Sequence, residues 1–405
     1  MTSETDTSPD EALRRDGPLS GLKIIEFTHY VMGPSIGVIL ADLGAEVIKI
    51  EPIEGDPTRR LLGSGAGYFP MYNRNKKSIR VDLRSTAGVK VATDLARWSD
   101  VVIENFRPGV MTRLGLDYEA LSQANQGLIY CSAKGFLAGP YDQRAALDEV
   151  AQMMSGLAYM TGPPGRPLRA GASVVDVTGG MFGVIGILAA LEQRHRTGRG
   201  QAVDCSLFET AAFLVGQHMA QKAVTGEAAK PMPVRTSAWA IYDVFDTADE
   251  RQVFVGVVSD PQWISFCDVF DRPDWALDPS LATNNQRASS RERIIPDLRA
   301  QLAQLSKAEL MRLAQKAKLP FAPVARPEDL ETDPHLLASE GLVRVTAGER
   351  GPADLPALPL RMAGQRAGVR LDVPSAGEHS HEILAQVLGL SPESIQALEQ
   401  QGAVA

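Results

Sequence analysis

One carboxylate is the first candidate for chemistry in this chain. Asp176 lies in a run of twenty residues, 172–191, that contains no other charged side chain. An ionised group is costly to keep in apolar surroundings unless it has partners or a function. Such a carboxylate can attack an activated acyl group and form a mixed anhydride. It can equally cap the apolar helix that follows, and residue types alone leave both interpretations open.

The segments around Asp176 predict an α/β protein. Short apolar strands alternate with helices, and a strand, helix and strand within about thirty residues form a βαβ unit. The alternating segments are 22–27, 35–43, 46–51, 78–82, 86–98, 100–103, 127–132, 178–195 and 202–206. The helix over 178–195 is apolar nearly all round and should be central. We therefore expect a large Rossmann-like, doubly wound domain.

A length of 405 residues favours two domains rather than one. Two stretches rich in proline and small residues predict connectors between them. The expected segments are a disordered tail (1–17), the N-terminal part of the large α/β domain (18–222), a linker (223–236), a smaller α+β domain (237–325), a second linker (326–359) and the C-terminal part of the large domain (360–405).

Charge and cysteine content exclude some classes of function. The formal net charge of −8, from 41 basic and 49 acidic side chains, argues against nucleic acid as a partner. The three cysteines show no metal spacing and no disulfide framework, so we expect a reducing cytoplasm. The run 172–191 reaches transmembrane length, but it carries Asp176 and four glycines and lacks a basic N-terminal flank. We interpret it as a buried helix and expect no membrane partner.

The common signatures of other enzyme classes do not occur in the sequence. It contains no GxGxxG, no GxxxxGK[ST] and no GxSxG, and its six histidines do not cluster at ligand spacing. These observations argue against dinucleotide, serine-hydrolase and metal sites. We expect no metal and no permanently bound cofactor.

Seven longer motifs carry a resemblance that covers nearly the whole chain. They are GPLSGLKIIEFTHYVMGP (17–34), LADLGAEVIKIEP (40–52), YNRNKKSIRVDLR (72–84), VVIENFRPGVMTRLGL (101–116), DEVAQMMSGLAYMTG (148–162), DVTGGMFGVIGILAALEQRHRTGRGQ (176–201) and GEHSHEIL (377–384). In these motifs the chain resembles the class III CoA-transferase family, of the formyl-CoA transferase and carnitine CoA-transferase (CaiB/BaiF-like) type. The resemblance implies a homodimer of interlocked subunits.

The resemblance also implies roles for single residues. Asp176 occupies the place of the family's nucleophile. The residues at the places of the CoA pocket are Val31, Met32, Leu83, Arg84, Asn105, Phe106, Arg107, Arg113, Leu147 and Asp148. Arginine guanidinium groups suit the CoA phosphates, although each arginine alone is equally well explained as a surface charge. Where some members have Lys-x-Tyr-Glu this chain has 145–148, so Asp148 stands in for the glutamate and the lysine and tyrosine are lost.

We therefore expect a CoA-transferase with an acyl-CoA and a carboxylic acid as its substrates. Asp176 would form aspartyl anhydride and aspartyl-CoA thioester intermediates. Family usage, together with Arg59 and Arg60, suggests succinyl-CoA as donor and a small dicarboxylic acid as acceptor. One alternative is a racemase of α-methylacyl-CoA thioesters, but Leu147 stands where that chemistry needs a proton acceptor and His29 alone does not complete the acid–base pair. The other alternative is a non-catalytic CoA-binding protein of the same fold.

Overall fold

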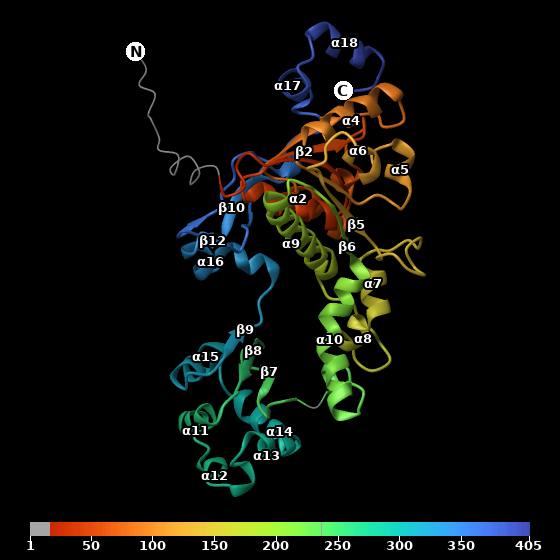
Figure 1. Cartoon of the computed structure of the whole chain (residues 1–405). Coiled ribbons are helices and arrows are strands. Elements are labelled where there is room, and N and C mark those ends of the chain that lie inside the picture. Colours follow the sequence, from red (N-terminus) through yellow and green to blue (C-terminus); the bar gives the residue numbers. More distant parts are fainter. Residues whose placement is uncertain (1–16, 236) are drawn as a thin grey trace. The chain divides into compact units, whose positions relative to one another are not determined.

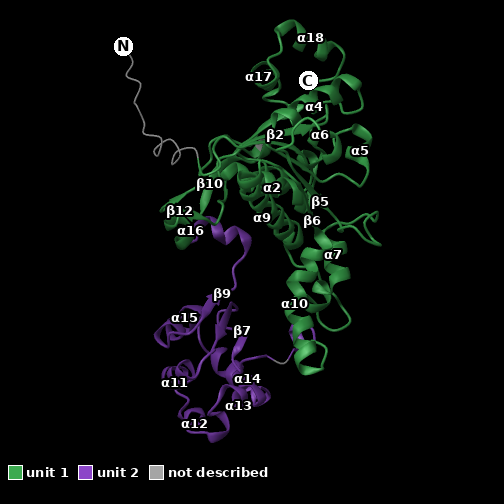
Figure 2. Cartoon of the chain, in the orientation of Figure 1, with its two compact units in different colours: residues 1–229, 334–405 green, residues 230–333 purple. Residues whose placement is uncertain are grey.

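Six parallel strands form the central sheet of the larger of two units. The computed structural model describes residues 17–235 and 237–405, and this unit, unit 1, comprises residues 17–229 and 334–405 (Figure 2). The strand order is β3-β2-β1-β4-β5-β6, which is the order of doubly wound Rossmann sheets. The strands are β1 (Lys23–Phe27), β2 (Glu46–Glu51), β3 (Lys76–Arg80), β4 (Val101–Glu104), β5 (Ile129–Lys134) and β6 (Ala202–Ser206). The predicted fold class is confirmed.

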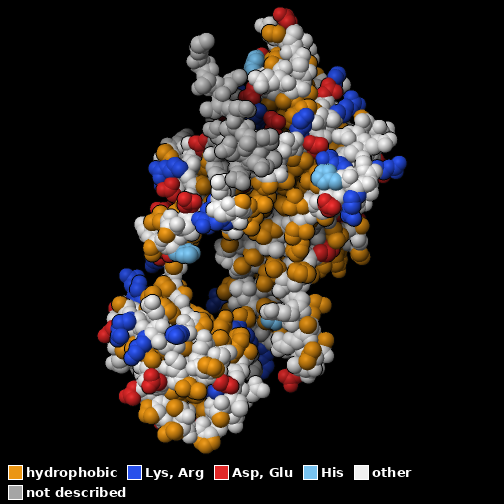
Figure 3. All heavy atoms as spheres, turned by 60° about the vertical axis from the view of Figure 1, so that its left-hand side comes forward, with side chains coloured by type: hydrophobic (Ala, Val, Ile, Leu, Met, Phe, Trp, Pro, Cys, Tyr) orange, Lys and Arg blue, Asp and Glu red, His pale blue; other side chains and the backbone are white. Residues whose placement is uncertain are grey.

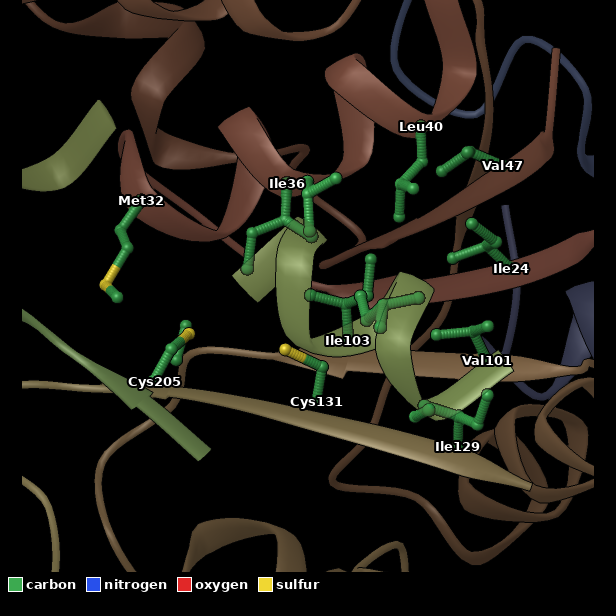
Figure 4. Close-up of a cluster of buried hydrophobic side chains, with 14 of the residues drawn as sticks. Ile24, Met32, Ile36, Leu40, Val47, Val101, Ile103, Ile129, Cys131 and Cys205 are labelled. Atoms are coloured by element: carbon green, nitrogen blue, oxygen red, sulfur yellow. The ribbon is translucent and has the colours of Figure 1, made fainter. Parts of the chain in front are cut away.

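Helices cover both faces of this sheet (Figure 1). Helices α2 (Met32–Asp42) and α9 (Val174–Thr197) lie over one face, and α4 (Thr86–Trp98) and the C-terminal helices lie over the other. Each face has its own buried cluster, and Figure 4 shows the cluster between the sheet and α2 and α9. The remaining helices of unit 1 are α3 (Tyr68–Tyr72), α5 (Val110–Leu114), α6 (Tyr118–Ser122), α7 (Asp148–Ser155), α8 (Leu157–Thr161), α10 (Leu207–Thr225), α16 (Pro334–Ala338), α17 (Ser380–Glu382) and α18 (Pro392–Gln400).

Helix α9 differs from the prediction at its start. It begins at Val174, so Asp176 lies inside the first turn rather than before the helix. The prediction had the helix begin at 178, with Asp176 before it as a possible N-cap. Helix α9 is the one described helix long and apolar enough to cross a membrane by length and composition. One of its faces packs on the sheet, while Met181, Ile185 and Leu188 remain exposed.

Unit 2, residues 230–333, is a small α+β unit with its own core. Its antiparallel sheet has the order β7 (Tyr242–Asp246), β8 (Gln252–Gly256) and β9 (Phe321–Pro323). Its helices are α11 (Asp260–Val269), α12 (Pro273–Ala276), α13 (Asn284–Ser289), α14 (Arg291–Leu302) and α15 (Lys307–Lys316). The rings of Trp263 and Trp275 stack with an interplanar angle of 6° and centroids 5.8 Å apart.

Both predicted linkers contain regular structure. Helix α10 continues to Thr225, three residues into the linker predicted over 223–236, and unit 2 begins at Lys230. The second linker, 326–359, was predicted from its prolines, yet unit 1 resumes at Pro334. A hairpin of β10 (Leu342–Thr346) and β11 (Pro352–Pro356) lies in this segment, followed by the short pair β12 (Arg361–Met362) and β13 (Gln365–Arg366). Prolines are tolerated there because the pair forms edge strands. The predicted tail lies outside the described residues except for Gly17.

Candidate functional site

The site begins where the direction of strand connection changes, between β1 and β4. In doubly wound sheets ligands bind at the carboxyl ends of the strands beside this point. The loops after β1 and β4 are tied together there: the His29 N–H donates to Asn105 Oδ1 at 3.0 Å, and Asn105 Nδ2 donates to the His29 carbonyl at 2.8 Å. The ring of Phe106 lies 5.7 Å from that of His29. The Asn105 side chain therefore fixes the two loops to each other.

Two fully buried lysines hold the loop between β1 and α2 from below. Lys49 Nζ donates to the Thr28 carbonyl at 2.6 Å, and Lys76 Nζ donates to the Pro34 carbonyl at 3.0 Å. Both lysines are ion-paired with Glu26 Oε1, at 3.6 and 2.9 Å respectively. Glu26, Lys49 and Lys76 thus hold both ends of the loop, which is where the sequence predicted CoA contacts.

Burial governs the titration of the groups beneath the crevice. It lowers the pKa of Lys76 to about 8, and the carboxylate of Glu26 only partly offsets this effect. It also lowers the pKa of His29, in spite of the nearby charge of Asp56. The His29 ring is therefore neutral at neutral pH.

The predicted phosphate-binding arginines lie at the same edge of the sheet. Leu83 and Arg84 follow β3, and Arg107 and Arg113 follow β4, so all four come after the carboxyl ends of strands. The Arg84 side chain is 79% exposed and its Nε lies 2.8 Å from Asp82 Oδ1. Arg107 and Arg113 are exposed, and neither forms an ion pair with any residue in 17–235 or 237–405. Their guanidinium groups are free to bind phosphate.

The side chains of Val31 and Met32 are not accessible, so only their backbone could contact a ligand. Both side chains are buried, and Met32 packs its methyl group against Gly179. A side chain on Gly179 would overlap Met32, and one on Gly180 would overlap Ser35 Oγ. The glycines after Asp176 therefore allow α9 to approach the N-terminus of α2 closely. This contact brings Asp176 to the carboxyl edge of the sheet.

The carboxylate of Asp176 is half-buried and has no partner among the described residues. It forms no hydrogen bond and no ion pair within the described part of the chain. The cap of α9 comes instead from Asp148, whose Oδ2 accepts from the N–H groups of Val175 at 2.9 Å and Asp176 at 3.1 Å. Asp176 is thus not the cap of its helix, which leaves it available for chemistry.

The surroundings of Asp176 favour its protonated form. The first amides of α9 would stabilise the ionised carboxylate, but the N–H groups of Val175 and Asp176 donate to Asp148 instead. Burial raises the pKa of Asp176 to about 7, with further increases from the charges of Asp148 and Glu149 that Arg169 only partly offsets. Asp176 is therefore near half-protonation at neutral pH.

Asp148 and Leu147 are neighbours in the sequence, but one is buried and the other is exposed. Asp148 is buried and its other oxygen accepts from Gln152 Nε2, so it orients α9 from the start of α7. Leu147 precedes α7 and its side chain is 58% exposed. Of the two, Asp148 is the one that contacts the segment carrying Asp176.

Arg59 is not the spare basic residue that the sequence suggested. Its Nη2 donates to Glu51 Oε1 at 2.6 Å, and its guanidinium stacks on Phe69 at 3.6 Å from the ring centroid. Arg60 donates to the Glu54 carbonyl at 2.7 Å. The charge of Arg59 is already paired with Glu51, so it attracts a substrate carboxylate weakly.

Sequence reasoning missed two side chains near Asp176. Tyr72, at the end of α3, has its pKa raised to about 12 by burial and by the charge of Asp176. Its hydroxyl has no hydrogen-bond partner among the residues that the structure covers. Arg169, in the loop before α9, is the cation whose charge acts on Asp176. A lone aromatic and a loop arginine carry no signal in a single sequence, because only folding brings them to Asp176.

No metal centre is apparent in residues 17–235 and 237–405, where no group of three or more His, Cys, Asp or Glu side chains has ligand geometry. The structure instead offers a carboxylate without a partner, on a sheet edge whose loops also carry the exposed Arg107 and Arg113. That combination suits covalent catalysis on an anionic thioester.

Known proteins match this chain over almost its full length. The model described as CoA-transferase family III matches residues 19–380. The succinyl-CoA:glutarate CoA-transferase of Mus musculus is 31% identical, over 96% of this chain and 90% of its own length. The acetyl-CoA:oxalate CoA-transferase of Acetobacter aceti is 36% identical, over 89% of this chain and 92% of its own length.

A solved structure extends this similarity to the fold. The crystal structure of a CaiB/BaiF family protein from Brucella suis has a TM-score of 0.81 and 32% identity to this chain. The alignment covers 92% of this chain and 100% of that one. Fold and sequence thus agree on one family.

Proposed function

Because the chain belongs to CoA-transferase family III, we propose that it moves CoA from succinyl-CoA to a small dicarboxylic acid through covalent intermediates on Asp176. That it is a CoA-transferase acting on acyl-CoA and carboxylic acid substrates follows from the family. The role of Asp176, the choice of acids and the residues of the CoA site are the proposal.

The exchange proceeds by four acyl transfers. An Asp176 carboxylate oxygen attacks the donor thioester carbonyl, the C–S bond breaks, and an aspartyl anhydride and CoA thiolate form. The thiolate attacks the Asp176 acyl carbon, which gives the aspartyl-CoA thioester and releases the donor acid. The acceptor carboxylate then attacks this thioester, its C–S bond breaks, and a second anhydride and CoA thiolate form. The thiolate attacks the acceptor acyl carbon, which restores the Asp176 carboxylate. No proton is consumed and no ATP is needed.

One observation supports this mechanism above all others. The Asp176 carboxylate is half-buried at the carboxyl edge of the sheet and has no partner in the described chain, while Asp148 performs the capping role. A nucleophile must have a free oxygen, and a raised pKa makes the ionised form more reactive. The exposed Arg84, Arg107 and Arg113 would bind the CoA phosphates, and Phe106 would offer a face to adenine.

The donor and acceptor follow the printed names of the relatives. These names include succinyl-CoA with glutarate, and acetyl-CoA or formyl-CoA with oxalate. A dicarboxylic acid recurs in each of them, which supports this class of acceptor.

Exposed apolar side chains on α9 and α10 support the proposed homodimer. Ile185 is 59% exposed and Phe213 is 72% exposed, with Met181, Met219 and Val224 also exposed on these helices. Hydrophobic side chains also gather over a wide area in the upper part of Figure 3. Exposed apolar surface of this kind is typical of an interface. Light scattering would test the assembly, and a monomeric mass would contradict it.

Three buried free cysteines are consistent with a reducing cytoplasm.

The experiment that tests the function traps the intermediate. The protein is incubated with succinyl-CoA alone, digested and analysed by mass spectrometry. We expect a CoA adduct on the peptide that contains Asp176, and we expect hydroxylamine to convert it to a hydroxamate. Asp176→Asn is the matched control and should carry neither product. A wild-type protein that exchanges CoA without either product would contradict the covalent role of Asp176.

A further inference from the structure

The loop before α9 places one arginine close to the reacting carboxylate. Arg169 Nε donates to the Ala170 carbonyl at 3.0 Å, and Nη1 donates to Glu149. The Ala170 N–H donates in turn to Gln152 Oε1 at 2.9 Å. The loop is therefore fastened to α7, the helix whose first residue caps α9. The guanidinium is held by the same element that orients Asp176.

Part of this guanidinium is still available for binding. Its Nη2 lies 3.7 Å from Asp148 Oδ1, within ion-pair range but beyond a hydrogen bond. Nη2 has no other partner in the described part of the chain. The Arg169 side chain is 33% exposed, so a ligand can reach it. The N–H groups of Nη2 can therefore donate a charge-assisted hydrogen bond to a carboxylate oxygen.

The charges around Asp176 favour a second carboxylate near Arg169. Three carboxylates act in this region, those of Asp148, Glu149 and Asp176, and Arg169 is the cation among the groups that shift the titration of Asp176. Asp148 is bound to the α9 amides and Glu149 to Arg169. When Asp176 carries CoA as a thioester its own charge is removed. An acceptor anion then meets less repulsion, and Arg169 remains to attract it.

A small dicarboxylic acid carries its second carboxylate only a short distance from the reacting one. With carbon–carbon bonds of about 1.5 Å, two or three methylene groups separate the two carboxyl carbons by about 4–5 Å. One carboxylate can therefore react at Asp176 while the other contacts a cation nearby. A monocarboxylic acid of equal length would leave the Nη2 donors unpaired.

We propose that Arg169 binds the distal carboxylate of a dicarboxylic acyl group and so selects dicarboxylic acids as substrates of this enzyme. The proposal rests on the proposed function, since it takes Asp176 as the site of acyl transfer. Arg169 here is a specificity residue that contacts the substrate away from the reacting carbonyl.

The test compares two acceptors of equal chain length, glutarate and pentanoate, in wild type and Arg169→Gln. In a two-step exchange, kcat/KM for the acceptor reports the second half-reaction only. We expect kcat/KM for glutarate to fall about 10- to 100-fold, which corresponds to charge-assisted hydrogen bonds lost to one carboxylate. The value for pentanoate should change by less than about threefold. Arg169→Lys keeps the charge but not the planar guanidinium. Its kcat/KM for glutarate should lie between those of wild type and Arg169→Gln.

Matched controls separate the possible outcomes. Arg166→Gln removes an exposed arginine from the same loop and should leave both acceptors unchanged. An equal fall for both acceptors in Arg169→Gln would mean that the residue only holds the loop, and an unchanged glutarate value would place the distal carboxylate elsewhere. Either result overturns the proposal. Failure of the proposed function looks different, because wild type would then form no adduct on Asp176 and transfer CoA to neither acid.

Discussion

Unit 2 and the carboxyl edge of the sheet in unit 1 both bury ionisable groups, but these groups differ in whether they have hydrogen-bond partners. In unit 2 the buried guanidinium of Arg287 donates to the carbonyls of Leu281 and Ala282 at 3.0 and 3.1 Å and pairs with Asp260. In unit 1 the half-buried carboxylate of Asp176 has no such partner in the described chain. A fully satisfied charge is structural, whereas an unsatisfied one indicates a reactive group.

The same contrast extends to what surrounds each group. The core of unit 2 is a stack of aromatic rings in which Phe266 lies 4.6 Å from Phe270 and 6.2 Å from Trp275. Beneath the crevice of unit 1, the largest fully buried side chains include Lys49 and Lys76. Apolar packing stabilises unit 2, and ion pairs position loops in unit 1. The following experiments would break or sharpen this difference.

Truncation of the aromatic core should have the largest effect on stability. Phe266→Ala removes a fully buried ring from unit 2, and we expect the free energy of unfolding of that unit to fall by about 3–5 kcal/mol. Tryptophan fluorescence during urea unfolding measures it, because Trp239, Trp263 and Trp275 lie in unit 2 and only Trp98 lies in unit 1. Ile264→Ala, at an exposed position of the same helix, is the control and should change little.

The titration of Asp176 should appear in both stability and rate. Its pKa is about 7 in the fold against 3.8 ordinarily, so the folded state keeps the proton longer and wild type loses stability as pH rises from about 4 to 7. Asp176→Asn should therefore be more stable than wild type above pH 7, by at most about 4 kcal/mol, and equal to it below about pH 4. Formation of the CoA adduct in wild type should speed up until about pH 7 and then level off. A stability difference that does not vary with pH would contradict this account.

Removal of one buried lysine tests whether charge in unit 1 positions the crevice. Lys76→Met leaves Glu26 without its closer partner, and we expect the free energy of unfolding of unit 1 to fall by about 3 kcal/mol. Far-UV circular dichroism follows both units, while fluorescence follows mainly unit 2, so the fluorescence transition should move less. Equal shifts of the two transitions would mean that the two units unfold together.

The smallest effect concerns the phenol beside Asp176. Tyr72→Phe removes only a hydroxyl that has no partner in the described chain, and we expect kcat to fall about tenfold with little change in KM. A hydroxyl that donates to charge developing during acyl transfer would act mainly on the transition state, and this split tests that role for Tyr72. Tyr118→Phe removes a hydroxyl on the opposite face of the sheet, where it donates to the Gly200 carbonyl, and serves as the control for loss of stability. An equal loss in both variants would assign the effect to stability.

The order of strands and helices in unit 1 was predictable because hydrophobic periodicity is a local property. The helix over 86–98 and the strand over 202–206 have the predicted bounds, since each is framed by residues that begin or end such elements. The proline-rich segment 326–359 was mispredicted, because the pairing of β10 with β11 depends on which strand lies opposite, not on composition. Composition alone cannot reveal that partner.

The sequence by itself determined that a carboxylate would stand alone in an apolar run, and that arginines would follow the strands of a parallel sheet. Only the tertiary structure decided what that carboxylate is. Asp148 accepts the hydrogen bonds of the first amides of α9. Burial, together with the negative charges of Asp148 and Glu149, raises the pKa of Asp176 to about 7. Tyr72 precedes β3 in the sequence and Arg169 follows β5, so three strands separate the two residues that act on Asp176. Protonation and specificity depend on distances through space, and those distances exist only once the sheet has brought its loops to one edge.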